Sequence, residues 1–239
     1  MIKKVILLIA VLLSGCTQMK EMIFSKTEQN CSLKQDVCKE NFYAMKQVMD
    51  KFKADGVSYV IMNMNTSEIV DEAYSSKDGI NYNKELKYSP SNLANMFVFA
   101  GGLYDGSLVV KDIKLNTIQP SGLKKVSKET RKQYYKELNL ERTSTPLQFL
   151  QAYNYVMTNE KTKDMAKILK DNVEKGAARR TYNKNLDIYG LTTTMNKSDY
   201  NPEVYTTFIG HVVKDNITYS LIAVMDNPKP LKETFGFTN

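Results

Sequence analysis

The stretch TPLQFLQAY, at residues 145–153, fixes the position of a helix near the middle of the chain. Thr145 suits the N-cap position, because its hydroxyl oxygen can accept a hydrogen bond from a backbone N–H that the first turn leaves free. Pro146 suits the first helical position, where no N–H donor is needed. We therefore predict a helix that begins at Pro146 and runs to about Met157.

Four further segments have the composition of helices. Apolar residues recur at three- and four-residue spacing in residues 37–54, which makes one apolar stripe. Residues 92–104 are apolar enough for a buried helix, whereas residues 129–138 are charged, as on a surface helix. A fourth helix is predicted over residues 162–175, because a glycine follows its last residue.

β-branched and apolar runs predict strands on both sides of these helices. Residues 57–64 and 68–74 precede the central helices as a hairpin, and three strands follow them, at about residues 186–195, 204–213 and 217–226. The order predicts an α+β fold, an antiparallel sheet with helices packed on it. In this fold the first and last strands can pair.

Composition narrows the function. With 239 residues, the chain holds one domain, or one domain with an extension. One His and three Cys are too few for most zinc sites, so we expect neither a metal nor a cofactor. The net charge is +7, but the lysines are spread out, which favours attraction to anionic lipid over nucleic acid. We expect the single His, His211, to pack in its strand or to face water.

The first sixteen residues have the features of an export signal. Two lysines give a positive start, residues 5–13 are uncharged and apolar, and small residues lead up to Cys16. The apolar run is too short to span a bilayer, which takes about 20 residues. The segment resembles the lipobox of bacterial lipoproteins, which implies a signal peptide over residues 1–15 and a lipid on Cys16. The alternative is an ordinary signal peptide that contains a cysteine.

The lipobox resemblance implies a lipid-anchored protein on the periplasmic side of the cell envelope. Thr17, not Asp, follows Cys16, and by Gram-negative sorting rules this favours the outer membrane over the inner one. The next residues are polar, so we predict a tether over residues 16–36. The folded domain, with its N-terminal helix, is then expected over residues 37–239.

Cys31 and Cys38 are a candidate disulfide, since the expected compartment is oxidising. In one continuous helix, seven residues would separate them by about 10 Å, too far for a bond. A bridge therefore requires that the helix begin between them. The alternative is two free thiols.

Four segments resemble, in family order, the transpeptidase domain of penicillin-binding proteins, the serine acyltransferases of peptidoglycan synthesis. The most specific is TPLQFLQAY, against T-P-L-Q-L-x-x-A-Y. The others are YVIMNMNTSEI at residues 59–69, against V-x-D-x-x-T-G-E-I; YTTFIG at residues 205–210, against Y-x-x-S-F-x-G; and VMDNPK at residues 224–229, against V-x-D-x-P-K. The resemblance covers about residues 57–230 and implies a degenerate domain, shortened mainly over residues 103–138.

The resemblance implies an S-x-x-K motif, in which Ser is the nucleophile and Lys, one helical turn on, is its base. SNLAN at residues 91–95 occupies this place, with Asn92 for the Ser and Asn95 for the Lys. An amide neither accepts an acyl group usefully nor takes up a proton at neutral pH. If the register slips by one residue, Ser91 is the nucleophile but Ala94 replaces the Lys. Either register lacks a base.

The other two family motifs are altered as well. K-T-G, which binds the substrate carboxylate in the family, falls in GLTTT at residues 190–194. Leu191 removes the cation and Thr193 replaces the glycine, whereas Thr192 and Thr194 stay as hydrogen-bonding residues. The S-x-N motif has at most a shortened remnant at residues 120–122.

One literal S-x-x-K occurs, from Ser121 to Lys124. The segment KVSKE at residues 125–129 follows it, which indicates a solvated face, whereas the family motif lies on a buried helix. Chance matches are common in a lysine-rich chain. A catalytic pair of Ser121 and Lys124 is the alternative to a chance match.

These alterations favour a binding protein over an enzyme. Our first hypothesis is a lipid-anchored protein with a non-catalytic transpeptidase-like domain that binds peptidoglycan or a cell-envelope protein. The second is a divergent D,D-transpeptidase or carboxypeptidase that uses Ser91 or Ser121 and binds penicillin. The third is a lipoprotein of the secretion machinery that reuses the scaffold.

Overall fold

The computed structural model describes residues 26–77, 83–113, 122–198, 201–214 and 216–226. Cys16 and Ser121 lie outside these residues, as do the predicted signal peptide and the start of the predicted tether. The elements follow in the order β1 (Lys26–Cys31), α2 (Gln35–Lys51), β2 (Gly56–Asn63), β3 (Glu68–Ser76), η1 (Ser91–Leu93), α3 (Ala94–Asp105), η2 (Val110–Asp112), η3 (Leu123–Lys125), α4 (Lys128–Glu137), α5 (Pro146–Thr158), α6 (Met165–Lys175), η4 (Arg179–Thr181), β4 (Asp187–Ser198), β5 (Asn201–Lys214) and β6 (Ile217–Asp226).

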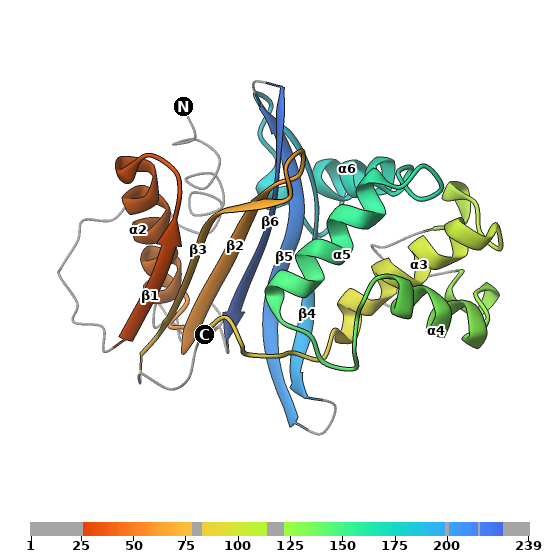
Figure 1. Ribbon diagram of the computed structural model, residues 1–239, viewed down its shortest axis with the longest axis horizontal. Coiled ribbons are helices and arrows are strands. Elements are labelled where there is room, and N and C mark those ends of the chain that lie inside the picture. The colour runs from red at the N-terminus through yellow and green to blue at the C-terminus, as the bar shows by residue number, and fades with distance from the viewer. Residues whose placement is uncertain (1–25, 78–82, 114–121, 199–200, 215, 227–239) are drawn as a thin grey trace, which may run out of the picture.

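The six described strands form one antiparallel sheet in the order β1-β3-β2-β6-β5-β4 (Figure 1). The early hairpin and the last strand meet at its centre, where β2 pairs with β6 from Gly56 opposite Asp226 to Asn63 opposite Tyr219. This pairing confirms the predicted α+β architecture with helices packed on an antiparallel sheet.

Helices cover both faces of the sheet (Figure 1). Successive residues of a strand point to opposite faces, and β2 is buried on both sides. Tyr59 and Ile61 pack against Met49 and the rest of the apolar stripe of α2. Val60 and Met62 join the larger core that α3 and α5 form on the other face. Each such apolar side chain, when fully buried, contributes about 1.5–3 kcal/mol to folding.

α5 begins where the sequence predicts. The hydroxyl of Thr145 accepts a hydrogen bond from the backbone N–H of Gln148 at 3.3 Å, and the Gln148 side chain accepts one from the N–H of Thr145 at 2.9 Å. This capping box satisfies two backbone donors at once. The TPLQFLQAY stretch is therefore the fixed start of a central, buried helix.

The predicted tether is wrong at its C-terminal end. Lys26–Cys31 forms the edge strand β1 on β3, and α2 begins at Gln35, inside the segment predicted as tether. An edge strand is held by backbone hydrogen bonds and needs no apolar alternation. Polar residues such as Gln29 and Asn30 join the sheet without the pattern that predicts a strand.

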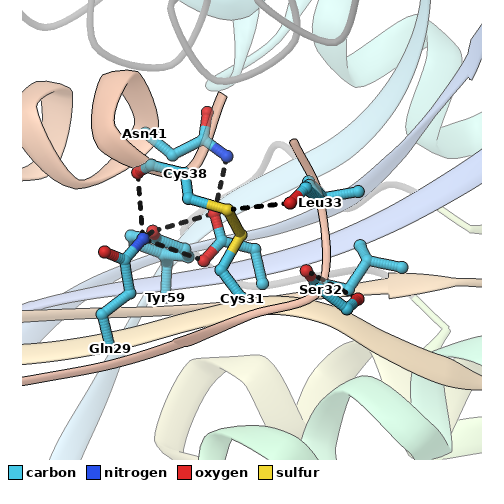
Figure 2. The surroundings of a disulfide bond; sticks show 9 residues. Gln29, Cys31, Ser32, Leu33, Cys38, Asn41 and Tyr59 are labelled. Atoms are coloured by element: carbon cyan, nitrogen blue, oxygen red, sulfur yellow. Dashed lines mark hydrogen bonds between the residues drawn. A yellow bond between two sulfur atoms is a disulfide. The ribbon is translucent and has the colours of Figure 1, made fainter. Parts of the chain in front are cut away.

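A disulfide joins Cys31, the last residue of β1, to Cys38 in α2 (Figure 2). The helix begins between the two cysteines, and their Cα atoms are 6.0 Å apart. The disulfide therefore ties the edge strand β1 to α2, the helix that packs on one face of the sheet.

A buried carboxylate lies beside the disulfide. Asp71 of β3 is opposite Cys31 and fully buried. It accepts hydrogen bonds from Asn41 at 2.6 Å, from the hydroxyl of Tyr59 at 3.0 Å and from Gln29 at 3.2 Å. Burial raises the pKa of Asp71, and the three hydrogen bonds offset part of that rise. Residues of β1, α2, β2 and β3 thus converge on one carboxyl group.

Candidate functional site

The residues in place of S-x-x-K lie where the chain passes from the sheet edge into α3. Ser89 and Asn196 of β4 exchange two backbone hydrogen bonds, of 2.8 and 3.1 Å. The turn η1 follows, with Leu93 fully buried in the core, and α3 begins at Ala94. The bridge and the buried Leu93 hold this segment beside the outer strand of the sheet.

Asn92 is exposed and points at that strand. Its side-chain amide donates a hydrogen bond to the hydroxyl of Thr194 at 2.8 Å, although the two residues are 102 positions apart. The structure thus brings together one residue from the S-x-x-K place and one from the K-T-G place. Each side chain satisfies the other, and neither is paired with a base.

Ser91, the other candidate nucleophile, has no base attached. Its backbone angle φ is +43°, a conformation that costs a non-glycine residue free energy. Within the described residues, no hydrogen bond reaches its hydroxyl. Ala94 and Asn95, both half-buried, offer no group that takes up a proton at neutral pH. A serine without an adjacent base is a weak nucleophile.

In the GLTTT segment of β4, the side chains divide between the two faces. Leu191 is 4% exposed and packs in the main core with Met195. Thr192 and Thr194 alternate to the opposite face. The Thr192 side chain makes no hydrogen bond in the described part of the chain. The structure therefore places Thr194, but not Thr192, in contact with the S-x-x-K segment.

Asn172 of α6 holds β4 next to the GLTTT segment, and no motif in the sequence points to it. It is fully buried; its side-chain amide donates to the carbonyl of Gly190 at 2.8 Å, and its oxygen accepts from the N–H of Ala177 at 3.2 Å. The available signal was a polar side chain among the apolar positions of the predicted helix. Asn172 fastens α6 to the outer edge of β4.

A short part of that edge stays open. Backbone groups of every second residue point to the same side of a strand. Gly190 and Asn196 both bond outward, the first to α6 and the second to the segment before η1. The N–H and C=O groups of Thr192 and Thr194 therefore point outward too, and no described residue pairs with them.

Neither any protein-family model nor any curated protein matches the sequence. Many solved structures match the fold, among them the following two. The transpeptidase domain of the FtsI4 D,D-transpeptidase from Legionella pneumophila matches with a TM-score of 0.56 and 14% identity, over 77% of this chain and 82% of that chain. The chain has the fold of a penicillin-binding transpeptidase domain. A peptidoglycan glycosyltransferase from Burkholderia ambifaria matches with a TM-score of 0.60 and 11% identity, over 84% of this chain and 91% of that chain.

The transpeptidase fold bears out the resemblance noted in the sequence. The Asn92–Thr194 hydrogen bond joins the start of α3 to β4, at the two segments that resemble the S-x-x-K and K-T-G motifs in sequence position.

The literal S-x-x-K segment adds nothing to this site that the structure describes. Ser121 lies outside the described residues. Lys124 is exposed in η3, and its neighbour Lys125 pairs with Asp112 at 3.3 Å.

His211 packs within the transpeptidase fold, on the sheet face that α5 covers. The hydroxyl of Tyr153 lies 2.6 Å from its Nδ1, and the ring of Tyr189 stacks on it at 4.4 Å. Burial lowers the pKa of His211 to about 4, so the ring is neutral at physiological pH. The contacts are those of a core residue.

No group of His, Cys, Asp and Glu side chains is arranged to hold a metal ion in the described ranges. No described helix is both long enough and apolar enough to cross a membrane.

Proposed function

We propose that this protein is a lipid-anchored protein of the cell envelope whose transpeptidase fold binds a partner and does not transfer acyl groups. The hydrogen bond from Asn92 to Thr194 carries the proposal, because it stands where the family has a nucleophile and its substrate contacts. Acyl-enzyme formation requires a nucleophile with an adjacent base. Ser91 has neither a lysine one turn on nor a hydrogen-bonded base within the described chain.

The membrane anchor is proposed from the N-terminal sequence. The charged start, the short apolar run and Cys16 are in register for lipid attachment, and more than one acyl chain anchors a protein stably. Thr17 after the cysteine favours the outer membrane in a Gram-negative host. Labelling of cells with an alkyne fatty acid should mark the wild type and not the Cys16→Ala variant. Labelling of both would contradict the anchor.

The binding partner that we propose first is peptidoglycan. Two observations favour it. The backbone groups of Thr192 and Thr194 are unpaired within the described residues, so a stem peptide could add there as a strand, and the fold is similar to that of a peptidoglycan glycosyltransferase. A cell-envelope protein is the second candidate and would use the same edge. Neither partner needs the lost base.

Co-sedimentation of the full chain with purified peptidoglycan sacculi tests this role. Thr192→Pro removes an outward N–H and should reduce the bound fraction, whereas Thr192→Val keeps the backbone and should not. Equal binding by both variants would contradict use of this edge. In parallel, fluorescent penicillin should leave the chain unlabelled, and a band lost on Ser91→Ala or Ser121→Ala would favour the enzyme hypothesis.

A further inference from the structure

A hollow of about 710 Å³ lies between α4 and the segment that leads into α3. Ser89, Pro90, Ser91 and Ala94 form one wall, and α4 with the loop after it forms the other. Thr192 and Thr194 do not line it, so this α4 hollow is a surface separate from the open edge of β4.

The α4 hollow is strongly basic. Lys128, Lys132 and Lys136 repeat every four residues, which places them on one face of α4 at intervals of about 6 Å. All three are exposed, and no described residue forms an ion pair or hydrogen bond with them. The acid in the wall, Glu141, is already paired with Lys87 at 3.0 Å. The positive charge of the three lysines is therefore not neutralised locally.

A fourth cation is fixed in place beside the three lysines. The guanidinium of Arg131 donates to the carbonyl of Val126 at 3.1 Å and to that of Leu123. Arg131 thus adds positive charge to the wall of the hollow, with its guanidinium hydrogen-bonded to the backbone.

Apolar surface lies between the charges. Pro90, Ala94, Leu140 and the ring of Tyr135 line the same hollow. The Tyr135 ring is half-buried and held edge-on against Phe97, with ring centroids 6.3 Å apart. A ligand that fills the hollow must therefore cover apolar surface as well as place negative groups near the lysines.

We propose that the α4 hollow binds an acidic segment of a partner protein, one that carries an apolar side chain between its carboxylates. The charge complements the three lysines, and the apolar side chain covers Tyr135 and Leu140. A flat anionic bilayer would contact the exposed lysines and leave the apolar surface of Tyr135 and Leu140 uncovered. A phosphate polymer has no apolar group that could cover this surface. The inference adds a second binding surface to the proposed function and stands without the acyl-transfer argument.

Fluorescence anisotropy with the full chain in detergent tests the proposal. The probe is a labelled peptide of repeated Glu-Glu-Leu, and the control peptide repeats Gln-Gln-Leu. The triple variant Lys128→Gln, Lys132→Gln, Lys136→Gln should bind the acidic peptide about tenfold more weakly, since each exposed contact contributes little and three are lost. A matched triple variant, Lys163→Gln, Lys167→Gln, Lys175→Gln, removes equal charge elsewhere and should bind as the wild type does.

The outcomes separate the possible occupants. Weaker binding of the Gln peptide, together with loss of affinity in added salt, supports the proposal. Equal affinity of the two triple variants would overturn it, as would equal binding of the two peptides. Vesicles of anionic phospholipid that bind in place of the acidic peptide, and only through the α4 lysines, would assign the surface to a membrane instead. If the acidic peptide does not bind, and fluorescent penicillin still leaves the chain unlabelled, this inference is overturned while the proposed function stands.

Discussion

The side-chain amide of Asn92 donates a hydrogen bond to the hydroxyl of Thr194 at 2.8 Å, and this contact ties the start of α3 to β4. In the resemblance, the first position belongs to the nucleophilic serine and the second to the strand that binds the substrate carboxylate. Here the two side chains satisfy each other. The fold therefore keeps the two segments together while their side chains hold one another.

The Asn92–Thr194 contact should stabilise the fold slightly and specifically. Asn92→Ala and Thr194→Val should each lower the free energy of unfolding by about 0.5–1 kcal/mol, the usual net contribution of such a bond. In the double variant the two losses should not add, because the second change removes a partner that is already gone. Urea denaturation of the four proteins measures this, and additive losses would show that the bond contributes nothing.

Asn172 should matter far more for stability. Asn172→Ala leaves the carbonyl of Gly190 and the N–H of Ala177 without their side-chain partner in a buried region, so we expect a loss of about 2–3 kcal/mol. Asn185→Ala is the control, because Asn185 is exposed and should change stability by less than about 0.5 kcal/mol. Equal melting temperatures for the two variants would show that α6 is not fastened to β4 in this way.

His211 gives a pH signature that is easy to read, since it is the single histidine of the chain. Burial lowers its pKa from 6.5 to about 4. Between these values the unfolded state binds more protons than the folded state, so this part of the stability is complete above pH 6.5 and is lost as the pH falls towards 4. A midpoint near 4 in an NMR titration of the imidazole is expected, and one near 6.5 would place the ring in water.

The pH dependence of stability that comes from Asp71 should be opposite to that from His211. The pKa of Asp71 is raised above the ordinary 3.8, so the folded state holds the proton more firmly than the unfolded state. The associated stability is greatest at low pH and is lost as the pH rises from 3.8 through the raised pKa. Relative to the wild type, Asp71→Asn should therefore gain stability as the pH rises over that window. Chemical denaturation at several pH values measures the difference, and a constant difference would contradict the raised pKa.

The sequence predicts elements best where local chemistry is strong. The start of α5 follows from Thr145 and Pro146, whose capping roles do not depend on the rest of the chain. β1 could not be predicted in the same way, because Gln29 and Asn30 are held through backbone pairing with a strand more than forty residues on. Edge strands of this kind leave little trace in the pattern of side chains.

In the candidate site, too, the sequence predicts residues that belong to a local motif and not those whose role depends on the tertiary structure. Asn92 and Thr194 were found by motif position, although the contact between them depends on the fold. Asn172 belongs to no motif. Its role depends on the carbonyl of Gly190 in β4, which only the tertiary structure brings close to it. The lysines of α4 have the pattern of an ordinary surface helix. Only the tertiary structure places Pro90 and Ser91 opposite them, so that the two segments enclose a hollow.

The proposal that the protein does not transfer acyl groups is tested most directly by the intact mass of the full chain after incubation with benzylpenicillin. The account predicts an unchanged mass, because no base is paired with Ser91 in the described chain and Asn92 offers no hydroxyl. A mass increase equal to one penicillin, absent from the Ser91→Ala or the Ser121→Ala variant, would contradict it.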